Sequence, residues 1–410
     1  MRTRMCFDDV AWEESDAIAD AWVAELFKTD TLRQIGDFIV KHRKGVPTEL
    51  CDPKAGAFNV SFRMKFEDGG SAIIRFPKPG ASMFPEEKIR NEVSVIRYLQ
   101  DHTSIPVPFI LHWGTKEESP LGLGPFIIME YIDHAMDLGA ALSTPGLKIE
   151  DRPLLDPRID SDKLEMLYGQ LADILLQLSR LSFPRIGSLT QVDDFTWEVT
   201  GRPLSINMNE LIRLGTLPRS KLPATPFDTA SSYLKALTEL HLEHLVHQRN
   251  DAADSVNDCR RKFVARQLFS PADFSYAPPW WLLLEQPEYW PGGIEAWTKA
   301  FETRLQTFLK VLIEREVAAI KQGRLKEDQR LSGPMQQSWE SGDFWVTYAA
   351  RKNFAFDAVF WQRLDYRFFG PSGVPEGDRW KQRIDLLDEE EKYYMEELVN
   401  RKLEEMKEKF

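Results

Sequence analysis

The sequence predicts an α+β protein in which a small antiparallel sheet with one helix precedes a larger, mainly helical part. Two observations support this. Apolar and polar residues alternate strictly from Phe58 to Phe66, the period of a strand with one buried face. Beyond residue 131, apolar residues recur at helical spacing in several long segments. With 410 residues, 43% of them apolar, the chain can form two or three packed units.

The expected elements follow a simple order. Residues 8–44 have helical spacing, and residues 58–66 and 72–76 form a hairpin whose turn is Asp68-Gly69-Gly70. A helix begins at Pro85, a residue type favoured in the first turn. Strands at 109–113 and 126–131 precede amphipathic helices, which cover residues 164–181, 233–247 and 295–320. The Pro-, Ser- and Thr-rich stretch 217–231 reads as a surface loop.

These elements divide the chain into four segments. Residues 1–44 form an N-terminal helical extension and 45–131 the sheet unit. Residues 132–380 form the helical unit, and 381–410 a charged helix packed by one face.

Charge and cysteine content narrow the partners and the compartment. The formal net charge of −12 disfavours nucleic acid, because an acidic surface repels phosphate backbones. The odd number of cysteines, Cys6, Cys51 and Cys259, argues against a disulfide framework and favours a reducing compartment. The first ten residues contain no apolar run typical of a signal peptide, and no window has the apolar length of a membrane span. We therefore expect a cytoplasmic protein with no membrane partner.

Four segments of the sheet unit carry candidate binding residues. They are the turn Gly56-Ala57-Phe58-Asn59-Val60, Arg75 in Ala-Ile-Ile-Arg-Phe-Pro, Glu92 in Arg-Asn-Glu-Val, and the strand from Gly124 to Asp133. Each also has a plain structural interpretation: a β-turn, a surface cation, a solvated helix acid and a core strand. The combination of a basic residue on a strand with an acid on the next helix is more specific than either residue alone.

Through these segments the chain resembles the aminoglycoside-phosphotransferase family, whose members have a two-lobed, protein-kinase-like fold. Further similar stretches are Asn250–Asp254, Cys259–Lys262 and Tyr276–Leu284. The resemblance implies transfer of phosphate from ATP, with magnesium, to a hydroxyl of a small molecule that the sequence does not identify.

The same resemblance assigns a role to each candidate residue. Gly56, Phe58 and Asn59 would lie in the loop over the phosphates. Arg75 would grip the α- and β-phosphates, as the strand lysine of kinases does, and Glu92 would position Arg75. The backbone of Glu130 to Ile132 would meet the adenine ring.

The catalytic elements that the family requires are not in the sequence. No Asp is followed five residues later by Asn, and no Ile-Asp-Trp occurs. The stretches that flank these elements in the family meet at Phe269–Ser270. Three explanations stay open: a block lost from the transcript or gene model, a pseudoenzyme that keeps a ligand- or partner-binding cleft, and an active enzyme with substitute carboxylates such as Asp273. We expect the chain as written to be inactive.

Two other constellations have ordinary structural interpretations. His241, His244 and His247 repeat at three-residue spacing on a helix, but no further metal ligands accompany them. Trp280 and Trp281 are expected to anchor the helical core rather than to stack on a ligand.

Overall fold

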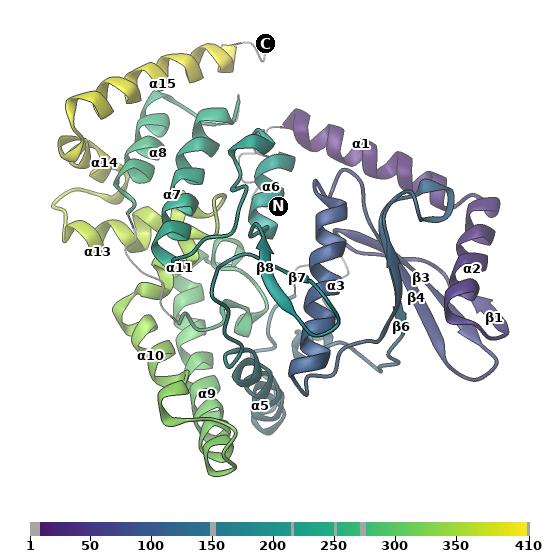
Figure 1. Cartoon of the computed structure of the whole chain (residues 1–410). Helices are drawn as coiled ribbons and strands as arrows, with labels where there is room; N and C mark the ends of the chain where they lie inside the picture. The colour runs from purple at the N-terminus through teal and green to yellow at the C-terminus, as the bar shows by residue number, and fades with distance from the viewer. Residues whose placement is uncertain (1–8, 148–152, 215–216, 250–251, 271–275, 408–410) are drawn as a thin grey trace.

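The computed structural model describes residues 9–147, 153–214, 217–249, 252–270 and 276–407 and has an α+β fold (Figure 1). The predicted sheet unit is present as a six-stranded antiparallel sheet in which β1, β3, β4, β6 and β5 lie in that order and β2 pairs with β3. Its strands are β1 (Pro47–Leu50), β2 (Lys54–Ala55), β3 (Asn59–Phe66), β4 (Ser71–Pro77), β5 (Ile110–Gly114) and β6 (Phe126–Glu130).

Three helices accompany the sheet: α1 (Asp9–Leu26), α2 (Thr29–Arg43) and α3 (Pro85–His102). The helical spacing over residues 8–44 corresponds to two helices and not to one continuous helix, because the chain breaks at Phe27 and Lys28. The break lets α2 turn back over the sheet. Figure 1 shows the sheet between α2 on one side and α3 on the other.

Residue alternation along the strands gives the sheet two different faces. Even-numbered residues such as Phe62, Ile74 and Phe126 pack with Ile35 and Ile39 of α2. Odd-numbered residues of the central strands, including Ile73, Ile127 and Met129, pack with Ile89 and Val93 of α3. The predicted placement of Phe62 and Ile74 in one sheet is confirmed, and they are direct neighbours in the β3–β4 register.

The rest of the chain is mainly helical, as predicted, with one exception. The hairpin formed by β7 (Ser188–Gln191) and β8 (Trp197–Gly201) was not predicted. The longer helices are α5 (Ser161–Leu178), α6 (Ile206–Leu214), α7 (Ala230–His247), α8 (Val256–Leu268), α9 (Gly293–Lys321), α10 (Ser332–Ser341), α11 (Asp343–Ala350) and α15 (Glu389–Lys407). The short ones are α4 (Leu138–Leu142), α12 (Phe356–Val359), α13 (Asp365–Phe369) and α14 (Arg379–Arg383).

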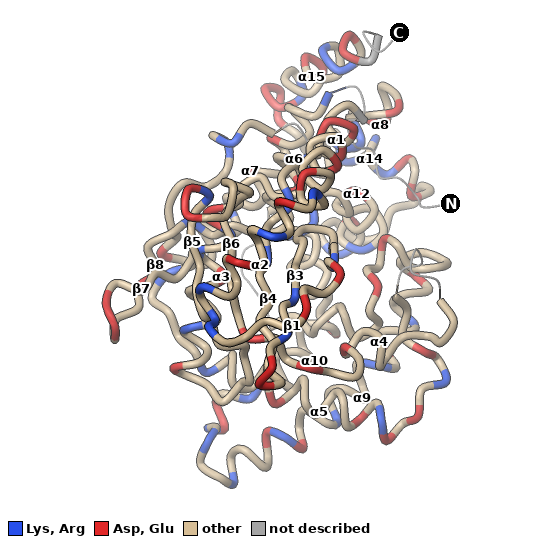
Figure 2. The backbone as a smooth tube through the Cα atoms, turned by 90° about the vertical axis from the view of Figure 1, so that its right-hand side faces the viewer, with Lys and Arg blue, Asp and Glu red and all other residues tan. Residues whose placement is uncertain are grey.

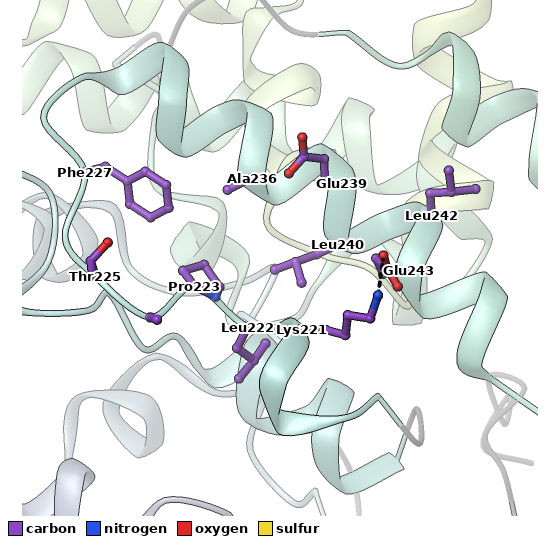
Figure 3. Close-up of a pocket in the computed structure, with 11 residues that line it drawn as sticks. Lys221, Leu222, Pro223, Thr225, Phe227, Ala236, Glu239, Leu240, Leu242 and Glu243 are labelled. Carbon is purple, nitrogen blue, oxygen red and sulfur yellow. Dashed lines mark hydrogen bonds and ion pairs between the residues drawn. The ribbon is translucent and has the colours of Figure 1, made fainter.

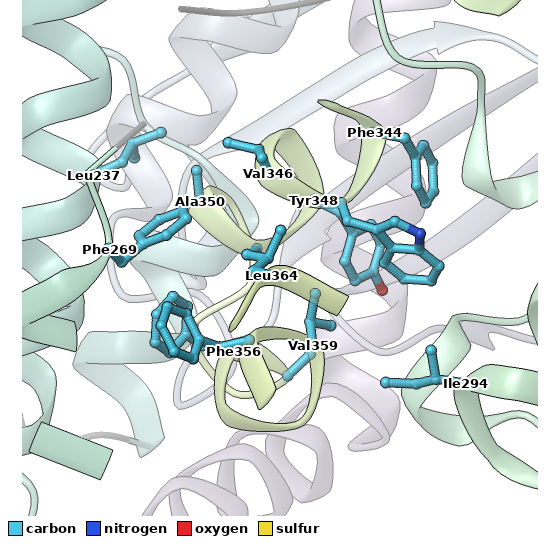
Figure 4. Close-up of a cluster of buried hydrophobic side chains, with 14 of the residues drawn as sticks. Leu237, Phe269, Ile294, Phe344, Val346, Tyr348, Ala350, Phe356, Val359 and Leu364 are labelled. Carbon is cyan, nitrogen blue, oxygen red and sulfur yellow. The ribbon is translucent and has the colours of Figure 1, made fainter. Parts of the chain in front are cut away.

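A large aromatic core fills the helical part. Trp297 of α9 stacks on Phe301 of the same helix and on Phe344 of α11. Val359 and Leu364 extend the cluster beyond Phe344 (Figure 4). The prediction for residues 217–231 is wrong in part, because Leu217 and Leu222 are buried in this core. No helix among the described residues has the length and apolarity needed to cross a membrane.

The sheet and helical parts meet along the start of α3. Arg202, which follows β8, makes a bidentate ion pair with Glu87 at 2.8 and 2.9 Å. Asn209 of α6 accepts from the Met83 N–H and donates to the Ala81 carbonyl, at 2.8 and 2.9 Å. The first turn of α3 is thus fixed against the helical part by hydrogen bonds at its N-terminal side.

The predicted junction at Phe269–Ser270 follows the C-terminal end of α8. If a block between the two parts is missing at Phe269–Ser270, the residues from Phe269 to Phe274 are expected to be poorly supported. Phe269 is nevertheless buried, and its ring lies 5.0 Å from that of Phe356 (Figure 4). The expectation is therefore wrong for Phe269, which packs as a regular core residue at the end of α8. Asp273 and its neighbours from 271 to 275 lie outside the described residues.

Two histidines of α7, His241 and His244, are buried in this region. Burial lowers the pKa of each to about 3, and the nearby Arg266 guanidinium acts in the same direction. The centroid of the His241 ring lies 4.2 Å from that of the Phe356 ring. Both imidazoles are neutral at pH 7, and their surroundings are those of core residues.

We predict that acid destabilises the protein through His241 and His244. The pKa of each histidine is lower in the folded protein than its unfolded value of 6.5. The free energy of unfolding is therefore highest above pH 6.5, and it falls below that pH because the unfolded state takes up protons that the folded state does not. Each contributes up to about 1.4 kcal/mol per pH unit in that window. Urea unfolding at pH 7 and pH 5 should show a smaller loss in His241→Leu than in the parent, whereas exposed His134→Gln should match the parent. An equal loss in all three proteins would contradict this explanation.

Candidate functional site

The predicted ion pair between Arg75 and Glu92 is present. Arg75 lies on the odd-numbered face of β4, and its guanidinium contacts a Glu92 carboxylate oxygen from α3. The two side chains are 23% and 29% exposed, so the pair is accessible from solvent. Helix α3 is held there by burial of Ile89 and Val93, which places Glu92 one residue before a buried position.

A second cation extends the pair into a network. The Lys88 ammonium lies 3.7 Å from the other Glu92 oxygen and donates to the Asn59 side-chain oxygen at 2.7 Å. Burial lowers the Lys88 pKa, whereas the nearby Glu92 raises it. The network therefore holds two cations and one carboxylate, an excess of positive charge that can attract an anion.

The turn at Gly56 lies just before β3, the strand that begins at Asn59. The Gly56 N–H donates to the Asn59 carbonyl at 2.9 Å, and the Lys78 ammonium lies 3.4 Å from the Gly56 carbonyl. Phe58 is half-buried and its carbonyl accepts from the Lys78 N–H. A Cβ at Gly56 would meet only the Asn59 carbonyl oxygen, at 3.9 Å, so the fold does not need glycine there.

The open part of the sheet face lies along β3. Helix α3 contacts β5 and β6, while the odd-numbered side chains of β3 remain half-exposed. These side chains are polar: Asn59, Ser61, Arg63 and Lys65. The strand thus presents a row of hydrogen-bonding groups beside Arg75, to which Ser61 is the direct neighbour in register.

The connector, residues 131–133 after β6, lies at the other end of this sheet face. Arg63 lies 3.8 Å over the Tyr131 ring and donates to Asp133 at 2.8 Å and to the Ser71 hydroxyl at 2.9 Å. Arg75 is opposite Ile127, so Glu130 lies three residues further along β6, about 10 Å away at the strand rise. The connector and the ion pair therefore bound one continuous polar surface.

Backbone groups of the connector are only partly used. The Glu130 and Tyr131 N–H groups donate to the carbonyls of Phe109 and Ser71, and the Ile132 carbonyl accepts from His134. Within the described chain, the Ile132 N–H makes no hydrogen bond. Ile132 is exposed, so this donor is available to a ligand.

Sequence reasoning missed Lys88 and Arg63. Lys88 precedes Glu92 by four residues, a spacing that brings side chains together on a helix, so a signal was present. Arg63 lies on the same side of β3 as Asn59 by strand alternation. Its partners Tyr131 and Asp133 are nearly seventy residues away, and only the fold brings them together.

A separate cavity of about 450 Å³ lies in the helical part, between α7 and the segment that precedes it (Figure 3). Leu222, Pro223 and Leu240 supply apolar walls, and Glu243 pairs with Lys221 at 3.0 Å. None of the predicted site residues lines this cavity. The described residues also contain no cluster of three or more His, Cys, Asp or Glu side chains suited to a metal ion.

We predict that Gly56→Ala changes the free energy of unfolding by less than about 0.5 kcal/mol, because no positive φ or close contact opposes a methyl group. The matched control is Gly80→Ala. Gly80 has a φ of +78°, and its Cβ would lie 2.2 Å from the Ser15 carbonyl oxygen, so this variant should lose more than about 1 kcal/mol. Chemical denaturation of both variants tests the difference, and similar losses would show that the Gly56 turn is wrongly described.

Comparison with known proteins gives a limited likeness. No family model matches the chain. Two subtelomeric hrmA-associated cluster proteins of Aspergillus fumigatus, from strains Af293 and CEA10, are each 26% identical to it over 143 residues. The match covers 35% of this chain and 25% of each relative, so this chain matches a quarter of their length. Function must therefore be argued from the site itself.

Proposed function

We propose that the chain is a kinase-like protein of the aminoglycoside-phosphotransferase type whose sheet unit binds ATP, and that in this form it does not transfer phosphate. The observation that carries the proposal is the network of Arg75, Glu92, Lys88 and Asn59. Two cations that share one carboxylate, both accessible from solvent, suit the phosphates of a nucleotide.

The phosphate end of the ligand would lie against Arg75 and Lys88. Arg75 is pre-oriented by Glu92, so less side-chain freedom is lost on binding. Asn59 holds Lys88 from the strand and could exchange this hydrogen bond for one to a phosphate oxygen. The Gly56 turn lies beside Lys78, which adds a third cation near the start of β3.

The base would lie toward the connector, on the apolar part of the same face. Half-buried Ile73 and exposed Ile132 offer aliphatic surface there, and the Ile132 N–H is a free donor within the described chain. Adenine binding needs apolar walls and a few backbone hydrogen bonds, which this end supplies. The Glu130 N–H is already donated to the Phe109 carbonyl, so Ile132 rather than Glu130 would supply the backbone donor.

Magnesium does not fit the residues present. The carboxylate in the network, Glu92, already contacts Arg75 and Lys88. The sequence also lacks the Asp and Asn pattern with which the family holds the metal. No step of the proposed function therefore involves a metal ion, and binding should be weak because phosphate charge is only partly neutralised.

The second candidate function is a binding module for another ligand or partner, with no nucleotide. Exposed apolar side chains lie in the connector and just after it, among them Ile132, Met136 and Leu138. They favour contact with a ligand or a partner protein in this region. The acceptor molecule of any ancestral transfer reaction is not identified by these residues. ATP binding distinguishes the two candidates directly.

We predict weak ATP binding that is nearly independent of magnesium, measured by isothermal titration calorimetry. Arg75→Met should raise the dissociation constant at least tenfold, because it removes one of the two phosphate-facing cations. Arg33→Met is the matched control, since Arg33 is exposed on α2 and, among the described residues, its one ion pair is with Asp30. Tight binding that requires magnesium would contradict the proposed lack of metal ligands, and equal binding by both variants would place the nucleotide elsewhere.

We also predict no ATP turnover by the purified chain against a panel of amino and hydroxy compounds. The reason is the loss of the catalytic Asp and the metal ligands, which act as a unit. Turnover abolished by Asp273→Ala would instead identify that residue as a substitute ligand. Turnover that survives Asp273→Ala would show that the chain is active through other residues.

The origin of the missing elements has its own test. The transcript can be sequenced across the codons for Phe269 and Ser270. An in-frame insert that encodes Asp-x-x-x-x-Asn followed by Ile-Asp would make the natural product an active kinase. A transcript without an insert would leave the inactive, nucleotide-binding form as the natural one.

A further inference from the structure

A second cationic site lies where three helices end. The C-terminal ends of α3, α5 and α9 surround a cavity of about 470 Å³. His102 and Thr103 line it from α3, Arg180 from the residues after α5, and Arg324, Lys326 and Gln329 from those after α9. The cavity thus joins a helix of the sheet part to two helices of the helical part.

The charge of this lining is unusual for the protein. Asp and Glu outnumber Lys and Arg by 64 to 52 over the chain, yet the cavity has three cationic residues and no carboxylate in its lining. In the described structure, no ion pair is formed by Arg180, Arg324 or Lys326, and Arg324 donates only to the Gln322 side chain. Figure 2 shows acidic and basic residues interspersed along the chain, so such local segregation is not the general pattern.

The cations are not needed to cap the helices that end here. The Thr103 N–H caps α3 through the Leu99 carbonyl, the Ser179 N–H caps α5 through Leu175, and the Gln322 N–H caps α9 through Ala318. Among the described residues, no side-chain hydrogen bond runs from Arg180, Arg324 or Lys326 to a helix carbonyl; only the backbone N–H groups of Arg180 and Arg324 donate to such carbonyls. The partial negative charge of the three helix C-termini offsets part of the cationic charge, so a ligand must be strongly anionic to gain from all three cations.

The site is separate from the Arg75 network but shares α3 with it. His102 lies ten residues after Glu92, about 15 Å along the helix. The Ser104 N–H and hydroxyl both donate to the Gln177 side chain at 2.9 Å, which ties the end of α3 to α5. Arg180, Arg324 and Lys326 all belong to the helical part, so an anion they hold would brace α3 through the lining residues His102 and Thr103 at its end.

We propose that this cavity binds a compact small-molecule polyanion, with at least two adjacent anionic groups, that braces α3 against the helical part. Such binding does not require ATP at Arg75. Phosphate and carboxylate polyanions share the required charge, and pyrophosphate and citrate serve as the two probes. Phosphate groups suit paired guanidinium groups best, so pyrophosphate should bind more tightly.

The test is calorimetric titration of the full chain with pyrophosphate and with citrate at low ionic strength. Arg180→Glu/Arg324→Glu should raise the pyrophosphate dissociation constant at least tenfold. The control Lys235→Glu/Lys299→Glu has the same change in net charge at two highly exposed helix positions and should bind as the parent does. Hydrogen exchange of α3 amides should slow on binding in the parent and in the control.

Three results would overturn the proposal. One is the absence of pyrophosphate and citrate binding at millimolar concentration. Another is an equal loss in the test and control variants, which would indicate a general charge effect. The third is binding that survives Arg180→Glu/Arg324→Glu but disappears in Arg75→Met, which would place the anion in the Arg75 network and leave the nucleotide proposal standing. Tighter citrate binding would keep the site and change its ligand to a polycarboxylate.

Discussion

The contact between Arg75 and Glu92 links the strand that centres the sheet to the helix that joins the two parts of the molecule. The other two groups of the network, Lys88 and Asn59, are both connected to this contact. Lys88 reaches Glu92 from the preceding helical turn, and Asn59 reaches Lys88 from β3. Glu87, the residue before Lys88, binds Arg202 of the helical part. A shift of α3 would therefore change the charged surface and the junction between the parts together.

Hydrophobic burial, rather than the ion pair, holds α3 in this position. Burial of Ile89 and Val93 stabilises the packing by about 1.5–3 kcal/mol for each side chain. A partly exposed ion pair contributes about 1 kcal/mol or less. The charged residues of this region are thus supported by the core and are available for binding. This division between an apolar anchor and a polar open edge is what makes the β3 side of the sheet a candidate site.

The sequence predicted those features that depend on local pattern. Alternation along β3 and β4 predicted the hairpin, whereas the Arg75–Glu92 pair was expected from the resemblance to kinase-like proteins. The break after Leu26 was missed because neither Pro nor Gly marks it. The β7–β8 hairpin has strands of four and five residues with little apolar alternation. The cationic cavity arises from three helix ends that are distant in sequence, so no local pattern could reveal it.

The most direct measurement is a crystal structure of the chain with a non-hydrolysable ATP analogue. We expect phosphate oxygens within hydrogen-bonding distance of Arg75 and Lys88, with the Arg75–Glu92 contact retained and the base beside the Ile132 N–H. An analogue bound away from the β3 face, for example among Arg180, Arg324 and Lys326, would contradict the proposed nucleotide site. So would an empty β3 face in crystals soaked with the analogue at a concentration well above the dissociation constant measured in solution.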